Sequence, residues 1–152
     1  MRVVVISGYW NPIHVGHLDY IENAKLLGDT LVVIVNSDAQ VKIKGSTPFM
    51  KEVARQRIAQ SIKGVDRAII SIDEDISVVE TLKFVWNYYS QDPEFKGMVF
   101  ANGGDRKEGN VPETNLCKEL GIQEIYGVGG EKIESSSDLL KAGSVLTKIR
   151  GM

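Results

Sequence analysis

The segment GYWNPIHVGH, residues 8–17, lies between a short apolar run and a helical pattern. The run at residues 3–6, Val-Val-Val-Ile, is typical of a buried strand. After the segment, apolar residues recur at three-residue steps: Leu18, Ile21, Ala24 and Leu27. A strand, a turn containing glycine and proline, and a helix in this order predict the first βα unit of a parallel sheet.

The segment contains two histidines, His14 and His17, three residues apart. Gly8 and Gly16 let a backbone pass close to a ligand. If the helix begins at Gly16, His17 lies in its first turn, where free amide groups and the helix dipole favour anions. Histidines at this spacing also cap helices or pack in cores, but the flanking strand, Asn11-Pro12 and Gly16 favour a phosphate site.

Length and composition predict one globular domain that spans residues 1–152. Charged residues make up 25% of the chain and hydrophobic residues 43%, which is ordinary for a globular protein. The 18 lysines and arginines against 20 acidic residues give a net charge of −2. This balance does not favour nucleic acid or an anionic membrane as a partner, so a bound anion requires a local pocket.

The single cysteine, Cys117, excludes a disulfide within the chain and a zinc site built from cysteines. We expect an inert thiol on an amphipathic helix. No apolar run reaches the roughly 18 residues that span a membrane, and the first residues show no signal-peptide pattern. These observations predict a cytoplasmic protein.

Strand and helix patterns alternate along the chain. Strands are expected at residues 3–6, 30–35, 67–72, 98–101 and 123–126. Helices are expected from about residue 16, and at 51–62, 76–89, 112–120 and 135–149. A loop that contains Lys42, Lys44, Gly45 and Pro48 is expected between the second strand and the next helix. The alternation predicts an α/β fold: a single-domain, Rossmann-like, doubly wound parallel five-stranded sheet with helices on both faces.

Polar clusters follow four of the predicted strands. Besides the segment 8–17, they are Asn36-Ser37-Asp38, Gly103-Gly104-Asp105-Arg106 and Ser135-Ser136-Ser137. Ligands of such sheets bind outside the carboxyl ends of the strands, at the point where the strand order reverses. Four polar clusters at one edge therefore predict the binding site.

Each cluster also has a structural explanation. Serine is a preferred helix N-cap, although hydroxyl groups at a helix start also bind phosphate. Gly103-Gly104 suits a turn, but two glycines also let the backbone lie against a base or sugar. Lysines in a loop are commonly solvated, but Lys44 facing a triphosphate would neutralise charge in a transition state. The chain has no GxxxxGK[ST] motif and no GxGxxG after the first strand, so neither of those phosphate loops applies.

The chain resembles the cytidylyltransferase-like nucleotidyltransferase superfamily, whose signature is HxGH. The resemblance runs from GYWNPIHVGH through LDYIENAKLLGDTLVVIVNSDAQVKIKG, RQRIAQSIKGVD and NGGD to SSS, in the order of the family. The stretches VNSD and GGD, together with Lys44-Gly45, look most like the adenylyltransferase module that activates heptose 1-phosphate. Glycerol-3-phosphate cytidylyltransferase comes next in similarity.

The resemblance implies that a substrate phosphate attacks the α-phosphorus of ATP or CTP, so that pyrophosphate leaves. Positioning and charge stabilisation would carry such a reaction. The implied catalytic residues are His14, His17 and Lys44. The implied nucleotide contacts are Gly8, Tyr9, Trp10, Asn11, Gly16, Gly103, Gly104, Asp105, Arg106, Ser135, Ser136 and Ser137. The implied acceptor contacts are Asn36, Asp38 and Arg57. Mg2+ would arrive with the triphosphate rather than in a carboxylate cage.

The chain departs from the family pattern at three places. Gly8-Tyr9-Trp10-Asn11 replaces Gly-Thr-Phe-Asp, which removes a charge at Asn11. Gly130 stands where the cytidylyltransferases have an arginine, a role left open between Lys132 and Arg106. Glu134 adds a negative charge beside the serines.

Two functions remain open at this point. The first is a nucleotidyltransferase that transfers AMP or CMP to a small phosphorylated acceptor, with a sugar phosphate or glycerol phosphate expected. The second is a catalytically weak, nucleotide-binding regulatory protein on the same fold. Both histidines and Lys44 occur together, which favours the enzyme. A homodimer is a further expectation, with Trp86, Tyr88 and Tyr89 available for an interface or for the core.

Overall fold

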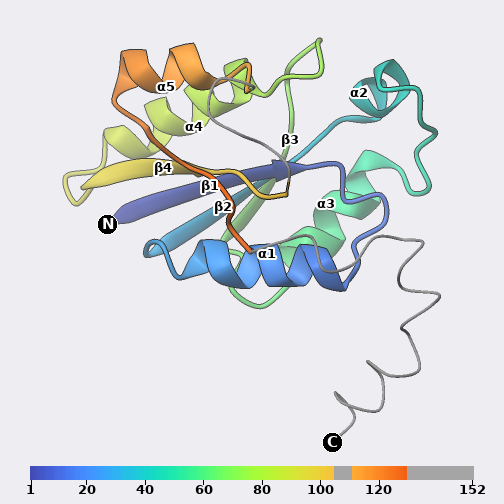
Figure 1. Cartoon of the computed structure of the whole chain (residues 1–152), viewed down its shortest axis with the longest axis horizontal. Coiled ribbons are helices and arrows are strands. Elements are labelled where there is room, and N and C mark those ends of the chain that lie inside the picture. The colour runs from blue at the N-terminus through green and yellow to red at the C-terminus, as the bar shows by residue number, and fades with distance from the viewer. Residues whose placement is uncertain (105–110, 130–152) are drawn as a thin grey trace, which may run out of the picture.

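The protein, here as a computed structural model, has one parallel five-stranded sheet with helices on both sides (Figure 1). The structure describes residues 1–104 and 111–129. The strands are β1 (Arg2–Gly8), β2 (Thr30–Val35), β3 (Arg67–Ile70), β4 (Gly97–Ala101) and β5 (Gln123–Ile125). The helices are α1 (Val15–Lys25), α2 (Asp38–Ile43), α3 (Glu52–Gln60), α4 (Val79–Ser90) and α5 (Thr114–Leu120).

The strand order is β3–β2–β1–β4–β5, so the chain builds outward from β1 in both directions. From β1 it continues through β2 to β3, and then crosses back to place β4 on the other side of β1. Val5 accordingly has Val32 of β2 and Phe100 of β4 as register partners. This reversal between β1 and β4 confirms the doubly wound fold predicted from the sequence, and it is where such sheets bind ligands.

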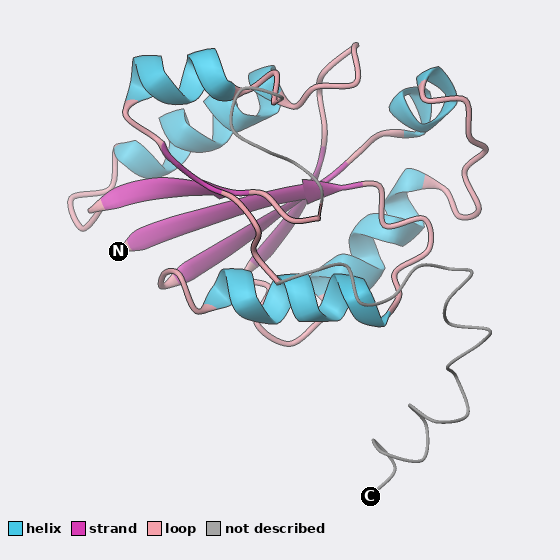
Figure 2. Ribbon diagram, viewed as in Figure 1, coloured by secondary structure: helices cyan, strands magenta, loops and turns pink. Residues whose placement is uncertain are grey.

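The sheet is buried on both faces, which explains why its central strands are continuous apolar runs. One face packs against α1 and α3, with Val4, Ile6, Ile21 and Ala59 in its core. The other face packs against α4 and α5 through residues of alternate strand positions, such as Val3 and Val5. Figure 2 shows the two helix layers on either side of the strands.

Helix α2 corrects the sequence prediction, which placed Lys42 and Lys44 in a loop. Residues 38–43 are helical, and Lys44 is the residue that ends the helix. The Ser37 hydroxyl accepts a hydrogen bond from the Gln40 amide at 3.1 Å, and the Gln40 side chain accepts one from the Ser37 amide at 2.9 Å. This reciprocal cap stabilises a helix too short to persist alone. The helix lies beyond the carboxyl ends of the strands (Figure 1).

The boundary between β3 and α4 also differs from the prediction. Strand β3 ends at Ile70 rather than at residue 72, and α4 begins at Val79 rather than at residue 76. The Asp73 carboxylate accepts hydrogen bonds from the amides of Glu80 and Thr81, at 2.8 and 2.9 Å. Because these two amides have no partner within the helix, Asp73 sets where α4 starts.

The aromatic residues Trp86, Tyr88 and Tyr89 of α4 and the single cysteine differ in their exposure. Trp86 and Tyr89 pack against the core, whereas 59% of the Tyr88 surface is exposed. Cys117 is buried in α5, and this burial raises the pKa of its thiol to about 12, as suits an inert thiol. Within the described residues, no helix combines the length and the apolar character that crossing a membrane requires.

Candidate active site at the carboxyl ends of the strands

The two histidines of the segment 8–17 form a reciprocal cap at the start of α1. Residue His14 is the N-cap, and its Nδ1 accepts a hydrogen bond from the Gly16 amide at 3.1 Å. The Nδ1 of His17 accepts one from the His14 amide at 3.0 Å. The two rings stack with their centroids 3.9 Å apart.

This geometry decides the tautomer of both rings. A backbone amide can only donate, so the Nδ1 that accepts from it has no proton. Each imidazole of His14 and His17 therefore carries its proton on Nε2. The site has two Nε2–H donors at the first turn of a helix, where the helix dipole also favours an anion.

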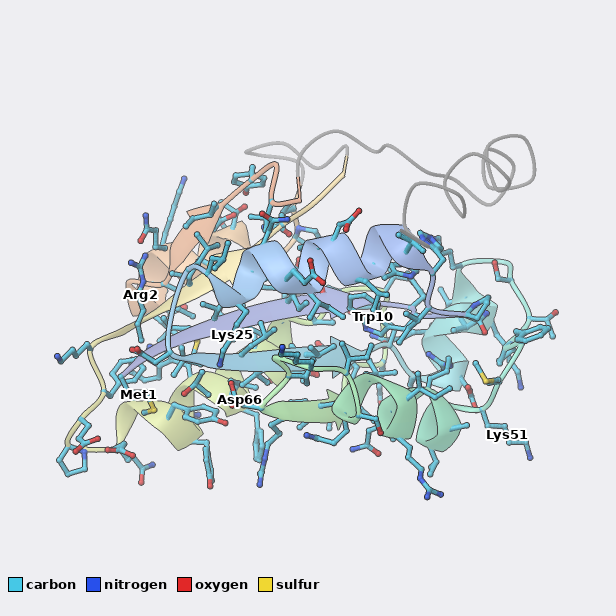
Figure 3. The ribbon with its side chains drawn as sticks, turned by 90° about the horizontal axis from the view of Figure 1, so that it is seen from below. Met1, Arg2, Trp10, Lys25, Lys51 and Asp66 are labelled. Carbon is cyan, nitrogen blue, oxygen red and sulfur yellow. The ribbon has the colours of Figure 1, made fainter. Side chains whose placement is uncertain are left out.

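Trp10 packs against His17 and is 1% exposed. Its indole N–H donates to the Ile34 carbonyl at 3.1 Å, and its ring meets the His17 ring edge-on with centroids 4.9 Å apart. Trp10 adopts a φ of 51°, a conformation that costs energy in a bulky residue. Figure 3 shows it at the end of the sheet opposite to Met1. Trp10, which the sequence predicted as a nucleotide contact, is thus a buried side chain that packs against His17.

Gly8 is required by the same packing. A Cβ at this position would lie 2.8 Å from the Trp10 ring, closer than real carbon atoms approach. The buried indole and the glycine at the end of β1 therefore depend on each other. The predicted ligand contact of Gly8 is limited to its backbone.

Asn11 connects the segment 8–17 to the loop between α2 and α3. Its side-chain amide donates to the Thr47 carbonyl at 3.1 Å, and its side-chain oxygen accepts from the Phe49 amide at 2.7 Å. An aspartate, which the family pattern has here, would only accept. The asparagine thus has a structural explanation: the donor that it adds holds this loop.

Arg55 of α3 is the central connection of the site, and the sequence reasoning missed it. Its side chain is fully buried and donates from Nη1 to the carbonyls of Tyr9 and Asn36, at 2.7 Å each. Its Nε donates to the Met50 carbonyl at 2.9 Å, and its Nη2 pairs with the Asp38 carboxylate at 2.7 Å. One guanidinium therefore joins the ends of β1 and β2 to α2 and to the loop before α3.

The sequence reasoning selected Arg57 instead, as an acceptor contact. Arg57 is exposed on α3 and does not belong to the buried face that carries Arg55. A signal was present, since Arg55 lies four residues before Ala59 and both share the buried face of the helix. A charged residue on the apolar face of a helix indicates a buried partner.

Asn36 and Asp38, the other predicted acceptor contacts, do lie at this edge. The Asn36 side chain is buried and donates to the Gln40 side chain at 3.0 Å. The Asp38 charge is paired with Arg55, and the Asp38 amide donates to the Glu52 carboxylate at 2.9 Å. Asn36 lines the pocket at this edge, whereas Asp38 holds Arg55 and α2 in place.

A pocket of about 150 Å³ opens between these elements. It is bounded by the ends of β1 and β2, by Lys44, by the loop before α4 and by the first residue before α5: its lining is Ser7, Gly8, Tyr9, Asn36, Lys44, Ile76, Val78 and Glu113. The Lys44 ammonium lies 4.2 Å from the centroid of the Tyr9 ring. The pocket thus combines one cation, one aromatic face, the acidic residue Glu113 and hydrogen-bonding groups.

The loop after β4 lies over α1. The Tyr20 hydroxyl donates to the Ala101 carbonyl, and a Cβ on Gly103 would lie 3.3 Å from the Tyr20 ring. Gly104 is exposed with a φ of 62°, which favours glycine. Backbone at this position is therefore open to a ligand beside α1. The predicted contacts Asp105, Arg106 and Ser135–Ser137 lie outside the described residues.

Among residues 1–104 and 111–129, no group of three histidine, cysteine or acidic side chains is arranged to hold a metal ion. The exposed acidic cluster after β3 includes Asp75, whose pKa is lowered by hydrogen bonds from the Ser77 hydroxyl and amide. Asp75 is thus engaged in a local turn.

Comparison with known proteins places the chain in a family. The family model described as cytidylyltransferase-like matches residues 5–138. The chain belongs to the cytidylyltransferase-like family. The match includes the whole segment 8–17, and it confirms the superfamily that the resemblance indicated.

Similar members of the cytidylyltransferase-like family have several names. The FAD synthase of Ferroglobus placidus is 46% identical over 76 residues, which cover 50% of this chain and 49% of that protein. The bifunctional protein HldE of Photorhabdus laumondii is 32% identical over 131 residues, which cover 78% of this chain and 28% of that protein. The chain therefore spans about half of the first relative and about a quarter of the second.

A solved structure shares the fold. It is the lipopolysaccharide core biosynthesis protein from Thermoplasma volcanium, with a TM-score of 0.64 and 28% sequence identity. The alignment covers 84% of this chain and 94% of the other.

Proposed function

We propose that this protein transfers a nucleoside monophosphate from a nucleoside triphosphate to a small phosphorylated acceptor. A phosphate oxygen of the acceptor bonds to the α-phosphorus, the bond from that phosphorus to the oxygen bridging to the β-phosphorus breaks, and pyrophosphate leaves with the electron pair. The observation that carries the proposal is the reciprocal cap of His14 and His17, which directs two Nε2–H donors to the start of α1.

The donors suit a reaction whose charge sits on phosphate oxygens. His14 and His17 would bind the oxygens around the α-phosphorus, and they act without giving up a proton. Such preorganised donors stabilise charge that develops in the transition state. Lys44 would add a positive charge from the pocket at the ends of β1 and β2. A divalent cation, Mg2+ in this proposal, belongs to the triphosphate substrate.

The nucleotide would lie along α1 and the loop after β4. Gly104 faces open space there for a flat base or a sugar, whereas Gly103 packs against Tyr20 and would offer its backbone. Asp105, Arg106, Ser135, Ser136 and Ser137 complete this part of the proposal on the family resemblance. We favour ATP over CTP because a relative is named FAD synthase, and FAD contains adenine.

The acceptor would occupy the pocket beside Tyr9 and Lys44. Its volume of about 150 Å³ is smaller than the roughly 300 Å³ at which pockets for drug-sized ligands begin. A sugar phosphate or glycerol phosphate suits this space better than a flavin nucleotide does. Asn36 and Ser7 supply hydrogen-bonding groups for hydroxyls of such an acceptor.

A matrix of substrates tests the proposal. ATP and CTP are each combined with hexose 1-phosphates, heptose 1-phosphate, glycerol 3-phosphate and flavin mononucleotide, and pyrophosphate release is measured. We expect release with a small polyol phosphate, and release about 10²–10³-fold slower with His17→Ala. Calorimetric binding of a triphosphate without release for any acceptor would contradict the enzyme and support the regulatory alternative.

A further inference from the structure

Tyr9 and Lys44 form a contact within the pocket that the reaction alone does not require. The Lys44 ammonium lies 4.2 Å from the centroid of the Tyr9 ring, which is within the range of a cation–π interaction. Both side chains line the pocket together with Ser7, Gly8 and Asn36 at the ends of β1 and β2. The family pattern has threonine at the position of Tyr9, so the ring departs from that pattern.

Tyr9 is anchored by its backbone. Its carbonyl accepts a hydrogen bond from the buried Arg55 at 2.7 Å. The next residue, Trp10, is buried, and its indole is bonded to the Ile34 carbonyl at 3.1 Å. On the other side, the Gly8 carbonyl accepts a hydrogen bond from the Asn36 amide at 2.9 Å, so the backbone that carries the Tyr9 ring is held before and after it.

The Lys44 side chain has no comparable anchor within its own helix. It is exposed, it ends the six-residue helix α2, and it precedes Gly45, whose φ is 89°. It forms no ion pair with any residue in the described ranges. Its long, flexible side chain would sample many positions without a partner.

We propose that Tyr9 is a positioning residue that holds the Lys44 ammonium over the pocket, an inference that rests on the function proposed above. The face of the ring attracts the cation without carrying a net charge. A carboxylate partner would neutralise the lysine and repel the phosphates. The ring leaves the positive charge intact and leaves other N–H groups of the ammonium for phosphate oxygens.

The first experiment compares Tyr9→Phe with Tyr9→Leu, and measures kcat and the KM for the triphosphate by pyrophosphate release. Phenylalanine keeps the aromatic face, whereas leucine keeps only apolar bulk. We expect the kcat of the leucine variant to fall about two- to fivefold below that of the phenylalanine variant, with a smaller change in KM. In a Lys44→Ala background, the two substitutions should give equal kcat.

A difference that persists without Lys44 would show that the ring acts on something else and would overturn the proposal. Equal kcat values with Lys44 present would do the same. A higher kcat in Tyr9→Leu would mean that the ring holds Lys44 away from the substrate, which also contradicts the assignment.

The second experiment does not depend on turnover. The lysines are labelled with ¹³C, and the ε-methylene resonance of Lys44 is assigned from its loss in Lys44→Arg. A position over the Tyr9 ring predicts an upfield ring-current shift, which Tyr9→Phe keeps and Tyr9→Leu loses. An unchanged resonance in Tyr9→Leu overturns the contact. If no acceptor supports turnover, the proposed function fails, and this measurement still decides whether Tyr9 positions Lys44.

Discussion

Two ion pairs at opposite ends of the sheet have the same length and very different surroundings. Arg55–Asp38 at the carboxyl ends and Lys25–Asp66 at the amino ends both measure 2.7 Å. The Arg55 side chain is 0% exposed and Asp38 26%, whereas Lys25 and Asp66 are 33% and 46% exposed. Figure 3 shows Lys25 and Asp66 side by side at the amino end, away from Trp10.

The difference shows that the distance between two charged groups does not by itself tell how much the pair contributes to the stability of the fold. Arg55 also donates to three backbone carbonyls, so its loss leaves several buried groups without a partner. Lys25 and Asp66 keep contact with water, which replaces much of what the pair provides. Among the described residues, Arg55 is the one buried arginine, and it lies at the end of the sheet that carries the candidate active site.

The largest effect is expected for Arg55→Met. Removing one partner of a buried, hydrogen-bonded pair costs about 3–5 kcal/mol, because Asp38 and the carbonyls of Tyr9 and Asn36 lose their donor. Urea denaturation measures the change in the free energy of unfolding. Arg57→Met on the same helix is the control and should change it by less than about 0.5 kcal/mol. Equal losses in the two variants would contradict the role of Arg55.

The next effect concerns His17, which is both a cap and a donor. In His17→Ala, turnover should fall by about 10²–10³ because one preorganised donor is lost, and unfolding should become easier by about 1 kcal/mol because the cap is lost. His17→Asn separates the two roles, since its oxygen can replace Nδ1 but nothing replaces Nε2. We expect the stability of His17→Asn to recover while its turnover stays low. Recovery of turnover would contradict the donor role.

A smaller effect is expected for Lys44→Ala. The positive charge should act mainly on charge that develops during the reaction, so kcat should fall by about tenfold or more while triphosphate affinity changes less. Lys42→Ala is the matched control, since Lys42 is an exposed lysine of the same helix and does not line the pocket. Pyrophosphate release gives kcat, and calorimetry gives affinity. Similar behaviour of the two variants would mean that only general positive charge matters.

The smallest effect is expected for Lys25→Ala, which should cost at most about 1 kcal/mol at neutral pH and leave turnover unchanged. Burial alone would raise the pKa of Asp66, but hydrogen bonds from Lys25 and from the Leu31 amide outweigh it, and the pKa lies below the usual 3.8. The pair therefore stabilises the fold above pH 3.8, and this stabilisation is lost as the pH falls through the lowered pKa.

Urea denaturation of both proteins between pH 7 and pH 3 checks this expectation. The difference between the parent and Lys25→Ala should shrink towards the acidic end. A difference that grows on acidification would mean that Asp66 is not stabilised by Lys25.

Much of the fold follows from the sequence. All five strands and the doubly wound arrangement were predicted from apolar runs and their alternation with helices, because burial on both faces of a parallel sheet requires such runs. The structure adds that the strand order reverses at β1. The position of His17 in the first helical turn follows from Gly16 and the helical spacing after it. Helix α2 was missed, although Ser37 and Gln40 have the spacing of a capping box.

The candidate site, like the fold, was predicted from the sequence only in part. The sequence by itself determined which segments meet at the carboxyl ends of the strands, because a parallel sheet places the residue after each strand at one edge. Only the tertiary structure showed which groups Arg55 reaches at this edge, while Arg57 is exposed. Arg55 bonds to Tyr9, 46 residues away, and to Asn36, 19 residues away. Such contacts depend on how α3 rotates and docks against the sheet, and the buried face of a nine-residue helix is set by packing with residues distant in the chain.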